Sequence, residues 1–196
     1  MDYRNYYKRD FKENYITYSL ILVNLTVFLL MTLLGGSTKI ANLVLFGAKV
    51  NSLIEAGQYW RLVTSMFIHI GFTHLLFNTY ALFVLGIFSE RMYGHGKFLV
   101  IYIFSGIIGA LFSFIFSPKI SAGASGAIFG LLGSILVYGW QKRFFWRSGL
   151  IYNIFIILAI NMAFGIITPG IDNFAHFGGF IGGIIISYII KLIFLK

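Results

Sequence analysis

One serine of this sequence lies between two glycines at the start of a long apolar run. The segment Gly123-Ala124-Ser125-Gly126 follows Pro118 and opens the run 122–140. A serine hydroxyl is a poor nucleophile until an adjacent base takes its proton, and that base is most often a histidine. The chain has no cysteine, so thiolate chemistry and disulfides are excluded. Ser125 is therefore the candidate nucleophile, and the question is which residue could activate it.

The composition indicates what kind of element carries this serine. The 196 residues are 59% hydrophobic and only 11% charged, whereas soluble domains carry about 25% charged residues. In soluble hydrolases a G-x-S-x-G serine lies on a strand-to-helix elbow, but the apolar flanks here predict that Ser125 opens a membrane-spanning helix. The chain is therefore expected to be a polytopic membrane protein whose single domain is a helical bundle.

Six apolar runs are long enough to cross a bilayer, which takes about 20 residues. They cover residues 16–34, 72–89, 98–116, 122–140, 149–167 and 171–190. The first run is too long for the core of a signal peptide, so it is expected to remain as a span. The stretch 35–71 holds only apolar pieces too short to cross, which predicts a long membrane-associated first loop. The other loops are short and make successive spans antiparallel: 90–97, 117–121, 141–148 and 168–170.

The basic residues predict the orientation, because cytoplasmic loops are enriched in Lys and Arg. With the N-terminus inside, most of the fifteen basic residues are cytoplasmic: Arg4, Lys8, Arg9, Lys12, Arg91, Lys97, Lys142, Arg143, Arg147, Lys191 and Lys196. The outer side holds Lys39, Lys49, Arg61 and Lys119. Both termini are therefore expected in the cytoplasm. Residues 1–14 form a cytoplasmic tail and residues 15–196 the membrane domain, with no soluble domain expected at either end.

This orientation brings the unusual polar residues to one depth. Spans two, four and six run inward from the outer face, and their outer ends carry His74 with Asn78, then Ser125, then His176. At a rise of about 1.5 Å per residue, these positions lie roughly 5–10 Å below the outer surface. The i, i+4 spacing of His74 and Asn78 places both on one helix face. The pattern predicts that Ser125 and His176 meet near the outer face.

Each of these residues also has a structural interpretation. A serine in a Gly- and Ala-rich helix often serves close packing, and an intramembrane histidine can pair with a structural partner. His69 and His95 lie at loop edges, where solvated or structural roles are expected. Asp172, at i−4 from His176, could complete a triad. A position one turn nearer the surface instead favours a helix cap or contact with water.

Together these motifs give the chain a resemblance to a known family. From about residue 15 to 190 it resembles the rhomboid intramembrane serine proteases, which implies an all-α membrane protein with a six-transmembrane-helix rhomboid-like bundle. A lone G-x-S-G is a weak signal, but all of the motifs in this order are a strong one. The segments that carry the resemblance are Trp60-Arg61, His74-Leu75-Leu76-Phe77-Asn78, Glu90-Arg91, Gly123-Ala124-Ser125-Gly126, and Ala175-His176-Phe177-Gly178-Gly179 with Gly183.

The resemblance implies roles for the polar residues. Ser125 would be the nucleophile and His176 its general base, in a dyad that needs no acid. The side chains of His74 and Asn78, with the backbone N–H of Ser125, would form the oxyanion hole.

It also implies supporting roles for neighbouring residues. Phe129 would pack on the catalytic imidazole, where the family often has a tyrosine. Independently of the resemblance, the polar helix starts and nearby glycines, Gly123 among them, suggest a cavity open to the outside. The Gly179-x-x-x-Gly183 spacing would let span six press against span four.

The activity implied is that of an intramembrane serine endopeptidase that cuts peptide bonds in or near transmembrane segments of other membrane proteins. Its expected partners are such substrates and the lipid bilayer, with no nucleic acid, no metal and no cofactor. Short loops and the absence of cysteine favour a bacterial plasma membrane. Two alternatives stay open: a non-catalytic rhomboid-like protein that binds membrane helices, and a haem or metal carrier that uses His69, His74 and His176.

Overall fold

The computed structural model describes residues 12–141 and 171–194, with isolated positions between them at 149, 152, 156, 159, 160, 163 and 165. Within these residues the only β-type pairing is an isolated antiparallel bridge between Lys49 and Ser121. The predicted all-α class is confirmed. The named elements are α2 (Tyr15–Leu33), α3 (Ile40–Phe46), α4 (Asn51–Glu55), α5 (Arg61–Thr64), the 3₁₀ helix η1 (Ser65–Phe67), α6 (Phe72–Tyr93), α7 (His95–Phe116), α8 (Ser125–Gln141) and α11 (Asn173–Phe194).

Four of these helices are long and apolar enough to cross a membrane, namely α2, α6, α7 and α11. The apolar helix α8 is shorter because it begins at Ser125, so the predicted opening of a helix by this serine is confirmed. These five helices match five of the predicted spans to within a few residues. The predicted span 149–167, apart from isolated positions, and residues 1–11 of the predicted tail lie outside the described residues.

The prediction of a loop at 90–97 is wrong. Helix α6 continues to Tyr93 and α7 begins at His95, so Gly94, with a φ of +75°, is the single residue between them. A positive φ favours glycine because glycine has no Cβ. Glu90, the first residue of the predicted loop, is only 1% exposed because it is part of a contact between helices.

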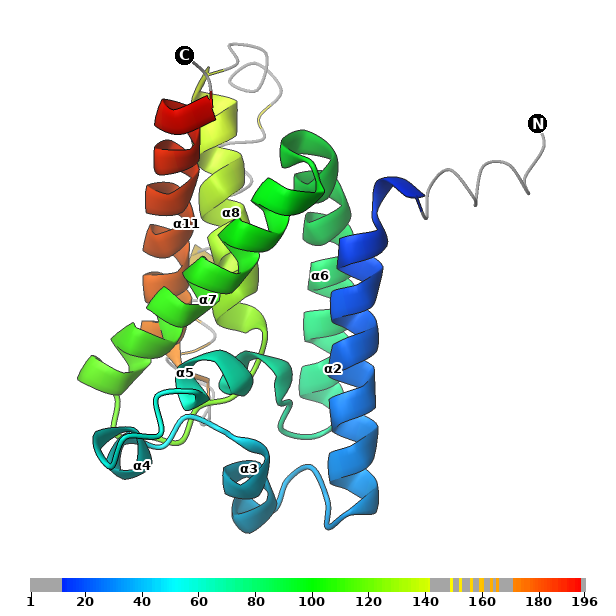
Figure 1. Ribbon diagram of the computed structural model, residues 1–196, viewed down its shortest axis with the longest axis vertical. Helices are drawn as coiled ribbons and strands as arrows, with labels where there is room; N and C mark the ends of the chain where they lie inside the picture. The colour runs from blue at the N-terminus through cyan, green and yellow to red at the C-terminus, as the bar shows by residue number, and fades with distance from the viewer. Residues whose placement is uncertain are drawn as a thin grey trace, which may run out of the picture.

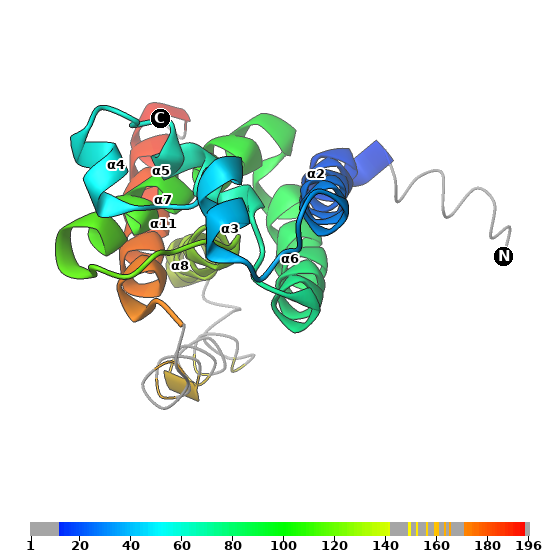
Figure 2. The same cartoon turned by 90° about the horizontal axis from the view of Figure 1, so that it is seen from below.

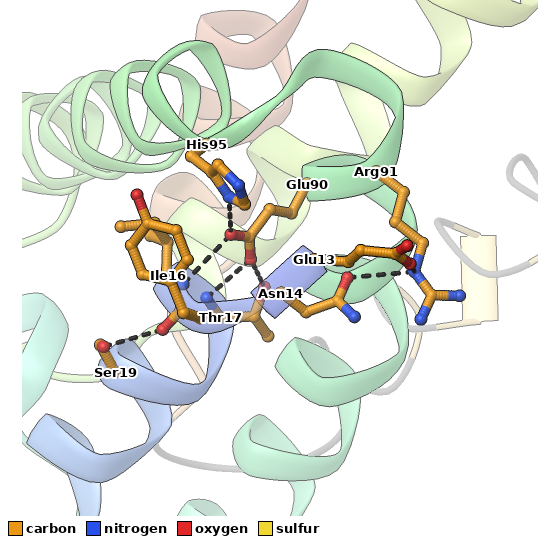
Figure 3. A network of polar contacts seen from close by, with 9 residues as sticks. Glu13, Asn14, Ile16, Thr17, Ser19, Glu90, Arg91 and His95 are labelled. Atoms are coloured by element: carbon orange, nitrogen blue, oxygen red, sulfur yellow. Dashed lines mark hydrogen bonds and ion pairs between the residues drawn. The ribbon is translucent and has the colours of Figure 1, made fainter. Parts of the chain in front are cut away.

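Glu90 caps the start of α2 from another helix (Figure 3). Its carboxylate accepts hydrogen bonds from the backbone N–H groups of Ile16 (3.1 Å) and Thr17 (2.8 Å) and from the Thr17 hydroxyl (2.6 Å). The Nδ1 atom of His95 lies 2.6 Å from the same carboxylate. The first N–H groups of a helix have no partners within it, and the positive end of the helix dipole favours a negative charge there. Glu90 therefore joins α2 to the corner between α6 and α7.

Helix α8 is the central helix of the bundle (Figure 1). Residues 126–135 are all buried, as expected for a helix that is apolar on every side. Helices α7 and α11 pack against α8 and against each other, α6 contacts α7 and α8, and α2 packs on α6. Helices α6, α8 and α11 run in one direction and begin at the end of the bundle that carries α3, α4 and α5. The common direction predicted for spans two, four and six is confirmed.

Glycines let α8 and α11 approach closely. A Cβ on Gly179 would overlap the carbonyl oxygen of Gly126, and a Cβ on Gly183 would overlap the carbonyl oxygen of Gly130. Both obstacles are backbone atoms, so neither can rotate away as a side chain can. The close contact predicted from the Gly179-x-x-x-Gly183 spacing is confirmed.

The segment between α2 and α6 lies at the end of the bundle at which α6, α8 and α11 begin (Figure 2). Its organising residue is Arg61, which is 4% exposed. The Nη1 atom of Arg61 donates to the carbonyl oxygens of Val44 and Ala48 (2.9 Å each), and Nε donates to the Gln58 side chain (2.8 Å). Arg61 therefore ties α3 to α5 through backbone groups. Large apolar side chains stay exposed on this segment: Ile40, Leu45, Tyr59 and Trp60.

Candidate active site

Ser125 and His176 lie within hydrogen-bond distance of each other. Ser125 is the first residue of α8, and His176 lies in the first turn of α11. The Nε2 atom of His176 is 2.9 Å from the Oγ atom of Ser125. His176 is buried and Ser125 is half-buried. The structure thus brings together the two side chains that the sequence places at one depth.

The imidazole of His176 is held by an aromatic ring. Phe129, one turn after Ser125, stacks on it with ring centroids 4.3 Å apart and ring planes inclined by 7°. If the Ser125 hydroxyl donates to Nε2, a neutral imidazole carries its own proton on Nδ1. That Nδ1 atom is buried and has no hydrogen-bond partner among the described residues. Stacking and Ser125 therefore orient the ring, and no carboxylate among the described residues hydrogen-bonds to it.

Asp172 caps α11. One carboxylate oxygen accepts a hydrogen bond from the backbone N–H of Ala175 (3.2 Å), which is N-cap geometry. The other oxygen accepts a hydrogen bond from the Ser113 hydroxyl of α7. The cap interpretation of Asp172 is confirmed, and no hydrogen bond joins this carboxylate to Nδ1 of His176.

We therefore expect Asp172→Asn to keep its rate of substrate cleavage within about threefold of wild type, since asparagine is as good an N-cap as aspartate. Initial rates at equal protein concentration check this. A loss close to that of His176→Ala would show instead that the carboxylate takes part in the reaction.

His74 and Ser125 border the same small space. The Nδ1 atom of His74 accepts a hydrogen bond from the backbone N–H of Ile70 (3.3 Å), which leaves the imidazole proton on Nε2. A Cβ built on Gly123 would lie 2.9 Å from His74 Nε2 and 3.7 Å from Ser125 Oγ. Gly123 also has a φ of +139°, a conformation that residues with a Cβ rarely adopt. The turn before Ser125 therefore requires glycine, and its absent side chain leaves room beside the His74 N–H donor.

Asn78 is buried one turn after His74 on the same face of α6. Its Nδ2 atom donates to the backbone carbonyl of His74 (2.9 Å). Its Oδ1 atom has no hydrogen-bond partner among the described residues. An amide nitrogen carries two N–H groups. Asn78 therefore has a further donor beyond the one used within its own helix.

His69 belongs to the surroundings of the site, and sequence reasoning missed this. Its side chain is 0% exposed, so the expectation of a solvated residue is wrong and the structural one holds. The Nε2 atom of His69 accepts a hydrogen bond from the backbone N–H of Ala124 (3.4 Å), and its ring centroid is 5.4 Å from that of His74. Burial, reinforced by His74, lowers the pKa of His69 to about 3, so the ring stays a neutral acceptor. No periodicity marks His69, because it lies in the turn before α6.

The fold and the site define a class: a helical membrane protein in which a serine and a histidine meet at the starts of two closely packed helices that run in one direction. The chain belongs to the rhomboid family, because the family model described as Rhomboid domain matches residues 56–192. The matched region contains His69, His74, Asn78, Ser125 and His176.

Relatives of this chain occur in bacteria and in a plant. The chain is 50% identical over 167 residues to Rhomboid protease GluP of Bacillus subtilis (strain 168), covering 85% of this chain and 33% of that protein. It is 35% identical over 203 residues to Rhomboid protease AarA of Providencia stuartii, covering 88% and 71%. It is 40% identical over 144 residues to RHOMBOID-like protein 1 of Arabidopsis thaliana, covering 71% and 36%. The chain thus spans about a third of the length of the first of these relatives.

Proposed function

We propose that this protein is an intramembrane serine endopeptidase with Ser125 as nucleophile and His176 as general base. The observation that carries the proposal is the 2.9 Å separation of Ser125 Oγ and His176 Nε2 at the starts of two apolar helices. Two of its relatives are named rhomboid proteases, which supports the same class of reaction.

In the proposed reaction, His176 Nε2 takes the hydroxyl proton of Ser125 while Oγ attacks the carbonyl carbon of the scissile peptide bond. The C–N bond breaks as the imidazolium gives that proton to the leaving nitrogen. Water then attacks the acyl-enzyme while His176 takes a proton from it. The bond between the acyl carbon and Ser125 Oγ breaks, and the imidazolium returns the proton to Oγ. The stacked ring of Phe129 keeps the imidazole in place through these proton transfers.

In the proposed reaction, three hydrogen-bond donors stabilise the negative oxygen of the tetrahedral intermediate. The proposed donors are Nε2–H of His74, the side-chain amide of Asn78 and the backbone N–H of Ser125. The last lies at the N-terminus of α8, where the helix dipole favours negative charge. His69 accepts from Ala124 N–H, which fixes the peptide unit between Gly123 and Ala124, one residue before Ser125.

Asn78→Ala is expected to lower kcat about 10²-fold, because removal of one oxyanion donor typically costs about 10²–10³ in turnover. KM should change little, since the donor acts mainly in the transition state. Steady-state kinetics with a model substrate separate the two constants. A wild-type kcat in Asn78→Ala would show that Asn78 is not an oxyanion donor. A complete loss of activity would show that Asn78 does more than stabilise the oxyanion.

The proposed membrane arrangement has six spans, with residues 149–167 as the fifth, both termini in the cytoplasm and Ser125 near the outer face. Residues 1–14 are its cytoplasmic tail and residues 15–196 its membrane domain. Four helices of spanning length and the shorter α8 support the count. The excess of basic residues on one side supports the orientation. The exposed apolar side chains between α2 and α6 support a membrane-associated first loop.

The proposed substrates are transmembrane proteins, cut in or near the outer end of a span, in a bacterial plasma membrane. The test incubates the purified full chain, reconstituted in liposomes, with a single-span model substrate beside the Ser125→Ala variant. The proposal predicts two fragments with the wild-type protein and intact substrate with the variant. No cleavage by the wild-type protein, or equal cleavage by both, would refute it.

The haem or metal carrier finds no comparable support. The Nε2 atoms of His69 and His176 face protein groups, the Ala124 N–H and the Ser125 hydroxyl. In the part of the chain that the structure describes, no group of three or more His, Asp or Glu could hold a metal ion.

A further inference from the structure

A lysine of the first loop is completely buried. Lys49 is 0% exposed, and lysine is almost never fully buried unless its charge is paired. Its ammonium group donates hydrogen bonds to the carbonyl oxygens of Ser117 (2.7 Å) and Lys119 (3.0 Å). Both carbonyls belong to residues 117–124, the connection between α7 and α8. Lys49 therefore holds the segment that leads to Ser125.

The backbone of Lys49 contacts the same connection further along. Its N–H donates to the carbonyl of Ser121 (2.9 Å), and its carbonyl accepts from the N–H of Ser121 (3.1 Å). Two residues later, the N–H of Gly123 donates to the carbonyl of Ser65 in η1 (2.9 Å). The first loop thus holds alternate residues of the connection by hydrogen bonds, and Ser125 follows directly.

The electrostatic surroundings of the Lys49 ammonium group include the C-terminal end of α7 and the carboxylate of Asp172. The Ser117 carbonyl is at the C-terminal end of α7, where the helix dipole favours a cation, and it also accepts from Asn51 Nδ2 (3.2 Å). Burial lowers the pKa of Lys49, and the carboxylate of Asp172 opposes this effect. Asp172 caps α11, the helix that carries His176. Lys49 therefore links the end of α7 to the connection by hydrogen bonds, and the charge of Asp172 favours its charged form.

We propose that Lys49 is a positioning residue for the reaction: its ammonium group fixes the connection between α7 and α8 and so sets the Ser125 hydroxyl against His176. Lys49 contacts none of the reacting atoms. Without the ammonium group, two buried carbonyls lose their donor, which costs free energy in the native state. The kinetic consequence rests on the proposed function. The hold of the Lys49 ammonium group on residues 117–124, called the tether below, can be measured without any substrate.

Hydrogen–deuterium exchange of the purified full chain, read by mass spectrometry, reports on the tether directly. Lys49→Met removes the charge and the donors at similar length, and Lys39→Met is the matched control because Lys39 is an exposed lysine of the same loop. In Lys49→Met, peptides that cover 117–125 are expected to exchange at least about tenfold faster, with α2 unchanged. Lys39→Met is expected to match the wild type throughout. Unchanged protection of 117–125, or an equal increase in all helices, would overturn the proposal.

Steady-state kinetics give the second readout, taken well below the unfolding temperature of each variant. Lys49→Met is expected to lower kcat about 10–100-fold with KM within about threefold, because a misplaced nucleophile slows the chemical step and leaves substrate binding intact. Faster exchange with an unchanged kcat, or a change in KM alone, would overturn the positioning role. Absence of cleavage by the wild-type protein would refute the proposed function. Hydrogen–deuterium exchange would still decide whether Lys49 holds residues 117–125.

A milder variant keeps the test decisive if Lys49→Met does not fold. Lys49→Gln carries one amide donor group in place of the ammonium. It is expected to lose protection in the same peptides and to lower kcat, each by less than Lys49→Met. Wild-type exchange and wild-type kcat in Lys49→Gln would overturn the proposal in the same way.

Discussion

Replacing either Ser125 or His176 with alanine is expected to lower the rate of substrate cleavage by at least about 10³-fold, and replacing both should cost no more than replacing one. The two side chains share one short contact, 2.9 Å between Nε2 and Oγ. A nucleophile without its base, or a base without its nucleophile, has nothing left to activate. Initial rates of the wild type, both single variants and the double variant in liposomes measure the effect.

Ser134→Ala is the matched control for Ser125→Ala. Ser134 is a buried serine of the same helix, and its hydroxyl donates to the backbone carbonyl of Leu131 (2.7 Å). Its replacement is expected to leave the rate near that of the wild type. Losses that multiply in the Ser125 and His176 double variant would mean that the two residues act independently, contrary to the dyad.

Gly183→Ala is expected to lower the free energy of unfolding by at least about 2 kcal/mol and to remove most of the activity. A single added methyl group would overlap the carbonyl oxygen of Gly130, a backbone atom that cannot turn aside. To avoid it, α11 must move away from α8, and that movement separates His176 from Ser125. Unfolding curves in detergent and cleavage rates measure the two effects.

Gly96→Ala provides the opposite case. Gly96 lies in α7, and a Cβ there would meet nothing within 4 Å. Alanine stabilises a helix relative to glycine by about 0.5–1 kcal/mol, so this variant should be at least as stable as the wild type and fully active. Equal behaviour of the Gly96 and Gly183 variants would contradict the close contact between α8 and α11.

The parts of the fold that follow a regular pattern could be predicted from the sequence. The apolar runs located α2, α6, α7, α8 and α11, and the common direction of three of them placed Ser125 and His176 at one end. The glycine spacing of α11 indicated its contact with α8. These features depend on length, periodicity and residue size, which are visible in the sequence alone.

The parts that depend on single long-range polar contacts could not be predicted. Glu90 caps α2 from a position more than seventy residues away in the chain, and no local sequence pattern indicates such a contact. His69 and Lys49 act through backbone groups near Ser125, and no sequence spacing marks such pairs. The second role of Asp172, as acceptor for Ser113, was hidden for the same reason.

Two of the basic residues counted in the predicted outer loop are buried. Lys49 and Arg61 were assigned to the outer side as loop charges, but both are buried and bonded to backbone carbonyls. Of the four basic residues on that side, Lys39 and Lys119 remain exposed. The charges of Lys49 and Arg61 therefore stabilise the fold of the first loop.

The most direct test of activation of Ser125 by His176 is covalent labelling with a fluorophosphonate, located by mass spectrometry of the digested protein. The wild-type protein is predicted to carry the adduct on Ser125, and His176→Ala is predicted to carry none under the same conditions. An adduct on another residue, or equal labelling of Ser125 in the absence of His176, would contradict the central claim.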